Sequence, residues 1–369
     1  MRPVAARPVA ALVAVALAAT AAHAQSADAV VDARHAGAEG ARVGGVRTYR
    51  TLGAALAAAP RDGRRPFVVR LRAGRYREKL SVDRPNVRLI GAHRDSTVIS
   101  WDDAAGTPAK GGGVLGTRGS WTLRVTAPGF RAEQLTVENA FDYPANARKP
   151  DGDPTKLQGT QAVALALTDG SDRAVLLDVR MTGYQDTFFA NAGRVYLRGC
   201  EISGHVDFIF GAARAVFEDC DILSRDRGDP RNNGYVTAPS TDAASPIGFL
   251  FVRSRLKKES PAMAANSVAL GRPWHPSATP MAVSSAVFLD CWMDDHITVA
   301  GWDRMSSVDS ATQVRYWFEP AVARFYEAGS TGPGAVASPT RRVLGPGDLR
   351  SYTIARTLGD WTPDVAPSK

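Results

Sequence analysis

A five-residue segment, Arg198-Gly199-Cys200-Glu201-Ile202, recurs after 20 residues as Glu218-Asp219-Cys220-Asp221-Ile222. Both copies read x-x-Cys-acid-Ile, so they look like the same structural position met twice. A period in the twenties, built from short strands and turns, is typical of a solenoid in which each repeat packs only on its neighbours. The repeat therefore indicates a stacked architecture rather than a globular core formed by distant segments.

Short apolar segments elsewhere have the composition of β-strands, and Gly, Asp and Asn interrupt them. They lie at residues 67–71, 87–90, 121–125, 163–167, 195–197, 215–217 and 248–252. Helical patterning is poor. These segments and the repeat together predict an all-β fold, a single-stranded right-handed parallel β-helix. Each coil would use about two dozen residues and stack on the next at roughly 4.8 Å, the ordinary interstrand spacing.

Stacked coils would also gather polar residues on one open face. Asp186 and Asp207 are 21 residues apart, and Gln161 precedes Gln185 by 24. Asp207 follows Val206 in an apolar, strand-like run, where an unpaired charge is costly. Two carboxylates held together in partly apolar surroundings have pKa values pushed apart, which suits one as nucleophile and the other as proton carrier.

The same stacking bears on the cysteines. Cys200 and Cys220 would have Cα atoms about 5 Å apart, which lies within the disulfide range. An exported protein can keep such a bridge, so we expect a disulfide between them, with two reduced core cysteines as the alternative. Cys291 is left over and is expected to be a small buried apolar residue.

The N-terminus predicts export. Residues 1–24 combine a positive start, a short Ala/Val/Leu run and Ala22-His23-Ala24, a small-x-small cleavage site, and they are interpreted as a signal peptide. The apolar run is too short to span a bilayer comfortably. Residues 25–45, rich in Ala and Gly, are expected to form a flexible leader, and residues 46–369 a single catalytic domain. The mature protein is expected to be secreted or periplasmic, with no membrane association.

The charge is moderately positive. Cleavage after Ala24 removes Arg2 and Arg7, so the net charge falls from +8 to +6. A positive balance suits an acidic polymer such as nucleic acid or an anionic polysaccharide, and equally a surface chosen for solubility. The basic residues are scattered, without a helix-borne cluster, so a nucleic-acid partner is not expected.

Five segments resemble the bacterial type of pectin methylesterase, and they occur in that family's order. They are GRYRE at 74–78, QAVAL at 161–165, GYQDT at 183–187, VDFIFG at 206–211 and LGRPW at 270–274. YVTAPST at 235–241 and GPGA at 332–335 extend the resemblance over roughly residues 50–335. The resemblance implies a right-handed parallel β-helix that removes methyl esters from polygalacturonate, working as a monomer without a metal or other cofactor.

The resemblance also implies the roles of five residues. Asp207 would be the nucleophile that attacks the ester carbonyl, and Asp186 the proton carrier that protonates methanol and later activates water. Gln161 and Gln185 would donate hydrogen bonds to the oxyanion. Arg272 would grip Asp207 with a two-point fork and keep it ionised.

Substrate contacts are predicted at four positions. Trp274, two residues after Arg272, can stack on the apolar face of a sugar. Thr122 resembles a substrate-contacting threonine. Phe208 and Met305 are also predicted to contact the substrate. Trp302 is a further candidate for the cleft wall, although Trp274, Trp302 and Met305 could each be plain core residues.

His205 departs from the family pattern, which has a small residue such as threonine there. On a regular strand it would face the same side as Asp207, two residues later. An imidazolium at this position would help to hold Asp207 ionised; the alternative is a tolerated substitution in the cleft wall.

Other functions are less consistent with these residues. We find no acid cluster of the kind that binds calcium in pectin lyases, and a glycosidase needs two carboxylates but no Gln pair. A serine hydrolase is disfavoured because no Gly-x-Ser-x-Gly occurs. The main alternatives are a related envelope esterase or thioesterase with a non-pectin acyl substrate, reshaped by residues 146–157, and a non-catalytic polysaccharide-binding β-helix.

Overall fold

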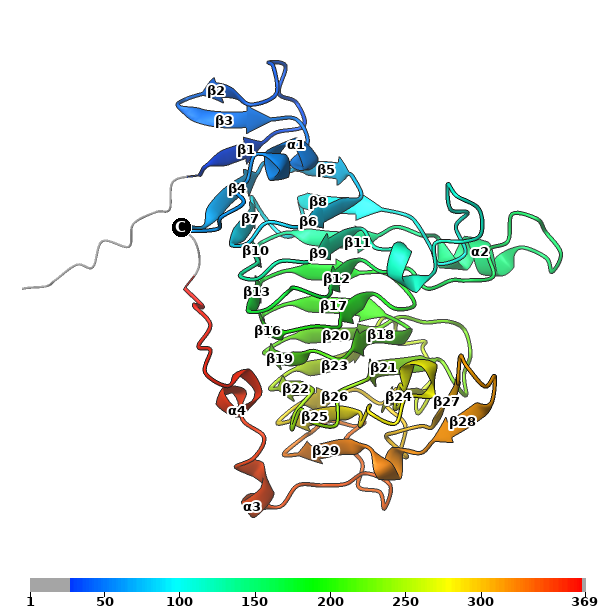
Figure 1. Cartoon of the computed structure of the whole chain (residues 1–369). Coiled ribbons are helices and arrows are strands. Elements are labelled where there is room, and N and C mark those ends of the chain that lie inside the picture. Colours follow the sequence, from blue (N-terminus) through cyan, green and yellow to red (C-terminus); the bar gives the residue numbers. More distant parts are fainter. Residues whose placement is uncertain (1–26, 367–369) are drawn as a thin grey trace, which may run out of the picture.

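The computed structural model describes residues 27–366, and three long sheets of parallel strands dominate it. Figure 1 shows their coils stacked in chain order from β1 to β29. In the first sheet, called sheet A, the order is β2 (Ala41–Val43), β3 (Val46–Tyr49), β1 (Ala29–Val31), β4 (Phe67–Leu71), β7 (Val87–Gly91), β10 (Arg131–Glu133), β13 (Ala174–Leu177), β16 (Arg194–Arg198), β19 (Arg214–Glu218), β22 (Phe249–Val252), β25 (Ser285–Leu289) and β29 (Arg324–Ala328).

Sheets B and C complete each coil. Sheet B has the order β26 (Trp292–Met293), β23 (Arg255–Lys258), β20 (Asp221–Ser224), β17 (Glu201–Gly204), β14 (Arg180–Thr182), β11 (Thr136–Asn139), β8 (Thr97–Trp101) and β5 (Gly74–Arg77). Sheet C has the order β24 (Val268–Gly271), β21 (Gly234–Pro239), β18 (Val206–Gly211), β15 (Phe188–Ala190), β12 (Leu165–Leu167), β9 (Leu123–Val125) and β6 (Leu80–Val82). The predicted parallel β-helix is confirmed, and each predicted apolar segment contains a strand.

The repeat that predicted the fold is one rung of this stack. Arg198 pairs with Glu218, Glu201 with Asp221 and Ile202 with Ile222. Between the strands of sheets A and B, the chain bends through one residue in the left-handed region. These bend residues are Gln134, Asp178, Gly199, Asp219, Arg253 and Asp290, with φ between 50° and 63°. The residue after each bend points into the core. That is why Cys200, Cys220 and Cys291 all occupy equivalent buried positions.

The predicted disulfide is wrong: Cys200, Cys220 and Cys291 are all free thiols. The Cys200 Sγ donates to the carbonyl oxygen of Leu176 at 3.4 Å, and the Cys220 Sγ to that of Glu218 at 3.3 Å. In-register coils hold equivalent Cβ atoms at about the 4.8 Å strand spacing, with parallel Cα–Cβ directions. A disulfide needs Cβ atoms about 3.8 Å apart and converging. A Cα–Cα distance in the disulfide range was therefore not sufficient to predict a disulfide between Cys200 and Cys220.

The segment predicted as a flexible leader, residues 25–45, contains two strands, β1 and β2, where the structure describes it. β1 pairs in parallel with both β3 and β4, and Ala29 and Val31 are fully buried. β2 pairs antiparallel with β3. This segment closes the N-terminal end of sheet A, because its short apolar stretch Ala29–Val31 completes the outermost coil. The predicted signal peptide, residues 1–24, lies outside the described residues.

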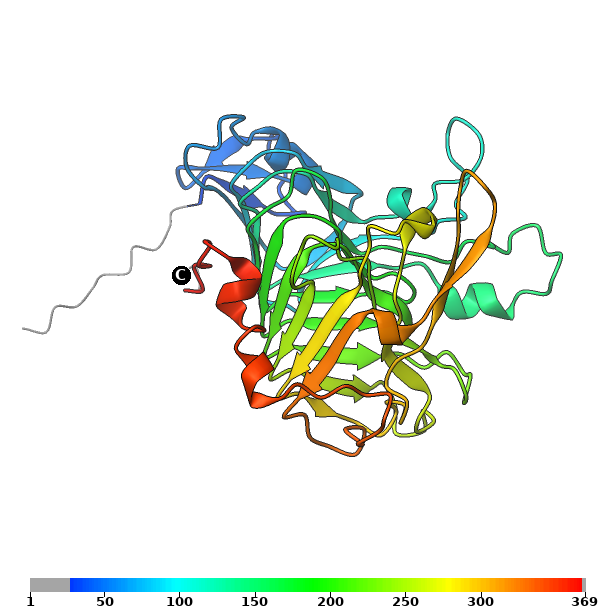
Figure 2. The same ribbon diagram turned by 60° about the horizontal axis from the view of Figure 1, so that its bottom comes forward.

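Short helices and one hairpin lie outside the sheets. The helices are α1 (Leu52–Ala57), α2 (Tyr143–Arg148), α3 (Pro346–Leu349) and α4 (Ile354–Leu358), with 3-10 turns η1 (Thr117–Gly119), η2 (Pro276–Ala278) and η3 (Pro320–Val322). α3 and α4 lie against the outer face of sheet A (Figure 2). The loop carrying α2 and the antiparallel hairpin of β27 (Met305–Val308) and β28 (Arg315–Phe318) project from the opposite side of the stack. Within the described residues, no helix is long and apolar enough to cross a membrane.

Candidate active site

A pocket of about 310 Å³ lies on the outer side of sheet C. All five residues predicted to be catalytic line it, namely Gln161, Gln185, Asp186, Asp207 and Arg272. A larger pocket of about 510 Å³ lies around Arg304 and Glu319 and contains neither aspartate of the pair. The acids therefore place the candidate site in the smaller pocket.

Unusual backbone geometry brings the two acids to this face. Asp186 and Asp207 both lie in the left-handed region, with φ of 62° and 50°. Among non-glycine residues Asp and Asn enter this region most readily, yet it still costs about 1 kcal/mol. At Asp207 the pairing of β18 with β21 shifts register between Val206 and Ile209. This irregularity turns the Asp207 carboxylate outward from a strand whose neighbours are buried.

Arg272 holds Asp207 through a two-point fork. Its Nε donates to Oδ1 at 2.8 Å and its terminal nitrogen donates to Oδ2 at 2.6 Å. The guanidinium also lies 3.9 Å from the ring centre of Tyr235. The Tyr235 hydroxyl donates to Asp303 at 3.2 Å. Packing on one face and a carboxylate at the tip leave Arg272 little freedom, so the negative charge on Asp207 has a fixed partner.

Asp186 has different surroundings although its side chain is the same. Its backbone N–H donates to the carbonyl oxygen of Val206 at 3.1 Å, which sets it beside the coil that carries Asp207. Burial, and then the negative charge of Asp207, raise the pKa of Asp186 well above its ordinary value, while Arg272 opposes them. A neighbouring acid was expected to raise this pKa, but burial is the larger cause. The pair thus combines an arginine-bound carboxylate with a carboxyl that keeps its proton.

The two glutamines stack on successive coils, as a parallel bridge joins Gln161 to Gln185. The hydroxyl of Thr160 donates to Oε1 of Gln185 at 3.0 Å. Because the amide oxygen is occupied, the NH₂ end is the one free to donate elsewhere. The stacked amides are donors of the type that stabilises an oxyanion.

An aromatic wall borders the acids. Phe189 and Phe210 stack with ring centres 4.4 Å apart and an interplanar angle of 11°, and Trp274 lies 5.7 Å from Phe210. Trp274 and Met305 line the pocket as predicted, Met305 reaching it from the hairpin. Phe189, Phe210, Thr117 and Arg118 also line it and were missed. The interval of 21 residues that singled out the acids also joins Phe189 to Phe210, so this signal was available.

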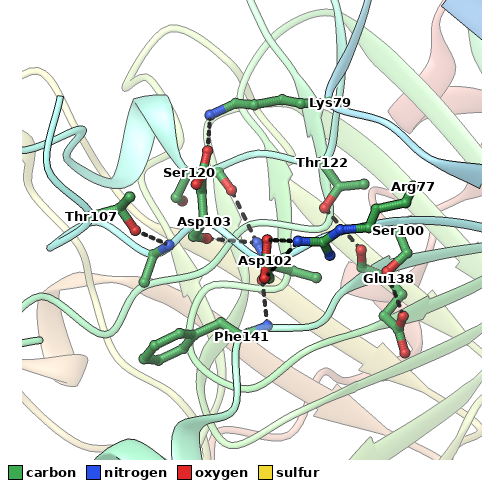
Figure 3. A network of polar contacts seen from close by, with 12 residues as sticks. Arg77, Lys79, Ser100, Asp102, Asp103, Thr107, Ser120, Thr122, Glu138 and Phe141 are labelled. Atoms are coloured by element: carbon green, nitrogen blue, oxygen red, sulfur yellow. Dashed lines mark hydrogen bonds and ion pairs between the residues drawn. The ribbon is translucent and has the colours of Figure 1, made fainter. Parts of the chain in front are cut away.

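Two predicted substrate contacts are wrong. Phe208 is fully buried in the core inside the coils, because the irregular backbone at Asp207 turns the next side chain inward. Thr122 is also fully buried, and its hydroxyl donates to the carbonyl oxygen of Glu138 at 2.8 Å (Figure 3). Trp302 is a core residue stacked on Phe325 at 4.2 Å and lines the larger pocket instead.

His205 does not carry a charge beside Asp207. It is 1% exposed and packs against Tyr143, with ring centres 4.4 Å apart. Burial, and to a smaller extent the charges of Arg227 and Arg225, lower the pKa of His205 to about 3. The imidazole is therefore neutral near pH 7 and lies outside the pocket, contrary to the imidazolium hypothesis. The strand irregularity at Asp207 separates the two side chains.

Comparisons with known proteins agree with the site. The family model described as Pectinesterase matches residues 41–347. Pectinesterase A of Dickeya dadantii is 41% identical over 330 residues, covering 86% of this chain and 89% of that protein. Pectin methylesterase PemA from Erwinia chrysanthemi has a TM-score of 0.86 at 41% identity, covering 93% of this chain and 100% of the other. Pectin methylesterase from Yersinia enterocolitica has a TM-score of 0.81 at 47% identity, covering 85% and 99%. With the acid pair, the arginine fork and the stacked amides in one pocket, these matches show that the chain belongs to the pectinesterase family.

Proposed function

We propose that this protein is a pectin methylesterase, which hydrolyses methyl esters of polygalacturonate to pectate and methanol. The observation that carries the proposal is the asymmetric acid pair: Asp207 in the fork of Arg272, beside the buried Asp186 with its raised pKa. A solved pectin methylesterase bound to a hexasaccharide matches this chain with a TM-score of 0.86 at 41% identity, which supports an oligosaccharide substrate here.

In the first half of the reaction, a carboxylate oxygen of Asp207 attacks the C6 carbonyl carbon of a methylated galacturonate. The oxyanion that forms is stabilised by the amide NH₂ groups of Gln161 and Gln185; one such donor contributes about 3 kcal/mol. As the bond from C6 to the methoxyl oxygen breaks, Asp186 gives its proton to the leaving oxygen and methanol departs. The product is an anhydride between C6 and the Asp207 carboxyl.

In the second half, Asp186 is ionised and serves as the base. It takes a proton from a water molecule that attacks C6 of the anhydride. The bond between C6 and the Asp207 oxygen breaks, which restores the Asp207 carboxylate and releases a galacturonic acid carboxyl group that loses its proton to the solvent. Asp186 regains its proton from the water, so both acids return to their starting states. No cofactor is needed.

The test is methanol release from highly methylated pectin by wild type and by Asp207→Ala. Wild type should release methanol without shortening the polymer, whereas Asp207→Ala should lose about 10⁴-fold or more of the rate. Shortened chains would indicate a lyase or glycosidase. Wild-type inactivity on pectin, with turnover of simple acyl esters, would overturn the proposal in favour of a different acyl substrate.

We also propose that the protein acts outside the cytoplasm as a monomer. The charged start, short apolar run and small-x-small site in residues 1–24 support export. Mass spectrometry of protein purified from the producing cell should find a mature chain beginning at Gln25, and light scattering should give the mass of one chain. A chain that still begins at Met1 would contradict the proposed export, and the mass of a dimer would contradict the proposed monomer.

A further inference from the structure

Two apolar side chains of the pocket wall, Trp274 and Met305, are held in different ways. Trp274 belongs to the coils: its backbone N–H donates to the carbonyl oxygen of Pro239 at 3.1 Å, and its ring centre lies 5.7 Å from that of Phe210. Met305 belongs to the hairpin of β27 and β28, which projects from the stack (Figure 2). The β-helix therefore sets the position of Trp274, whereas that of Met305 depends on what holds the hairpin.

The hairpin lacks polar contacts with the coils in the part of the chain that the structure describes. There, every hydrogen bond made by residues 305–318 stays inside the hairpin, and none of these residues forms an ion pair. Its large side chains are mostly exposed, namely Val308, Val314, Tyr316 and Trp317. Its own hydrogen bonds thus shape the hairpin but do not attach it to the coils.

An aromatic contact joins the hairpin to the coils. The ring of Phe318 lies on the ring of His275, with ring centres 3.6 Å apart and an interplanar angle of 3°. Phe318 pairs directly with Met305 across the two strands, so both side chains point to the same face of the hairpin. His275 directly follows Trp274 in the chain. The stacked pair thus connects the hairpin to the segment that carries the other residue of the apolar wall.

The turn η2 fixes the imidazole of His275. Its Nδ1 donates to the carbonyl oxygen of Thr279 at 3.0 Å, because a carbonyl oxygen can only accept. Between these residues, Ser277 and Ala278 both lie in the left-handed region, with φ of 50° and 56°. Residues strained in this way persist only where the surrounding structure over-determines them. The strained turn and its hydrogen bond therefore hold the buried imidazole in one orientation, stacked on Phe318.

We propose that His275 is a positioning residue, which holds the hairpin against the coils through Phe318 and so keeps Met305 in the wall of the pocket. This inference rests on the proposed function, because it assigns the wall to the binding of the sugar. The acid pair, the two glutamines and Arg272 lie on the coils and are not carried by the hairpin. Loss of the stack should therefore weaken the binding of substrate while the chemical step is preserved.

The first test separates KM from kcat in methanol release from highly methylated pectin. His275→Ala should raise KM about three- to tenfold, the fold-change that corresponds to one aromatic pair, and leave kcat nearly unchanged. Phe318→Ala should give the same result from the side of the hairpin. Because both variants break one contact, the double variant should be no worse than either single variant. His275→Phe keeps a flat ring that can stack on Phe318, so it should restore most of the wild-type KM.

Limited proteolysis with trypsin gives a second readout that involves no substrate. Arg315 is exposed in the hairpin, and cleavage after it should be faster in His275→Ala than in wild type, because the hairpin spends more time away from the coils. Trp317→Ala is the matched control for the kinetic test. It removes a ring from the face of the hairpin opposite to Met305, so KM should stay at the wild-type value.

A fall in kcat at unchanged KM, or wild-type KM and cleavage in His275→Ala, would overturn the inference. A raised KM without faster cleavage after Arg315 would also overturn it, because His275 would then act on the substrate directly. Wild type that releases no methanol from pectin would instead contradict the proposed function, and the cleavage comparison would still test the attachment of the hairpin.

Discussion

Asp186 and Asp207 are chemically identical side chains that their neighbours make different. Both carboxyls are buried, but Asp207 has the fork of Arg272, whereas Asp186 makes no such ion pair and has its pKa raised. Both acids need the left-handed backbone that turns them out of the strand direction. At this scale the two acids differ because Arg272 is bound to Asp207 and not to Asp186, so replacement of Arg272 should affect Asp207 more than Asp186.

The raised pKa of Asp186 predicts a pH-dependent stability. In the unfolded chain this carboxyl ionises near 3.8, whereas the folded protein keeps its proton to higher pH. Since the folded state then binds more protons, wild-type stability falls as pH rises above about 4 toward the folded pKa. Asp186→Asn has no proton to lose. We expect its Tm, relative to wild type, to increase between about pH 4 and pH 7 in thermal melts. A Tm difference that does not vary with pH would refute this account.

Thr160 should act as a positioning residue for Gln185. Thr160→Val removes the hydroxyl that fixes the amide oxygen, and kcat for methanol release should fall about fivefold, the equivalent of one hydrogen bond. Thr160→Ser should restore most of the rate. In a Gln185→Ala background, Thr160→Val should have no further effect, because the amide it orients is absent. An additive loss in the double variant would show that Thr160 acts through something else.

Among the structural elements, the bend between sheets A and B explains the cysteines. It places one buried residue per coil in a column, and Cys200, Cys220 and Cys291 fill three of its positions. Column positions point in parallel directions, so neighbours touch without converging. Burial raises the pKa of the Cys291 thiol to about 12 and raises that of Cys220 well above its usual range. Lack of solvent access to all three thiols, together with the raised pKa at Cys220 and Cys291, makes them inert in the folded state.

The thiol column predicts a reactivity pattern. Ellman's reagent should titrate three thiols per chain in denaturant and almost none in the native protein. Dithiothreitol should leave Tm unchanged, because there is no bridge to reduce. A count of one thiol in denaturant, with a lower Tm after reduction, would instead show that Cys200 and Cys220 are joined.

Across the whole molecule, two of the outer faces of the β-helix, those of sheets C and A, have different roles. Sheet C carries the pocket, while the C-terminal segment with α3 and α4 covers an apolar area of sheet A (Figure 2). Arginines of sheet A hold that segment: Arg214 donates to the carbonyl oxygen of Arg356 at 2.8 Å, and Arg198 to that of Val365 at 2.7 Å. The covering segment thus contributes to stability from the side away from the chemistry.

This separation predicts that stability and activity can be altered independently. Leu358, 1% exposed, packs into the apolar area between α4 and sheet A. Leu358→Ala should lower the free energy of unfolding by about 2–4 kcal/mol in urea titrations, through lost burial and the cavity left behind. At a temperature where both proteins are folded, kcat/KM for methanol release should be unchanged. A parallel loss of activity would mean that the covering segment supports the pocket.

The sequence by itself determined the stacked coils and the gathering of the two acids and two glutamines, because repeat length sets which residues lie above one another. The place of Arg272 beside Asp207 was predicted from the family resemblance. Only the tertiary structure showed the features that depend on local irregularities of the coils. The left-handed backbone at Asp207 turned Phe208 into the core, since a shift of one residue in a strand reverses the face of its side chains. The free thiols, the strands at 29–43, the burial of Thr122 and the position of Arg118 likewise depend on side-chain directions and on packing between distant segments. The spacing of residues along the chain predicts which coil of the stack each residue occupies, but not the direction in which its side chain points.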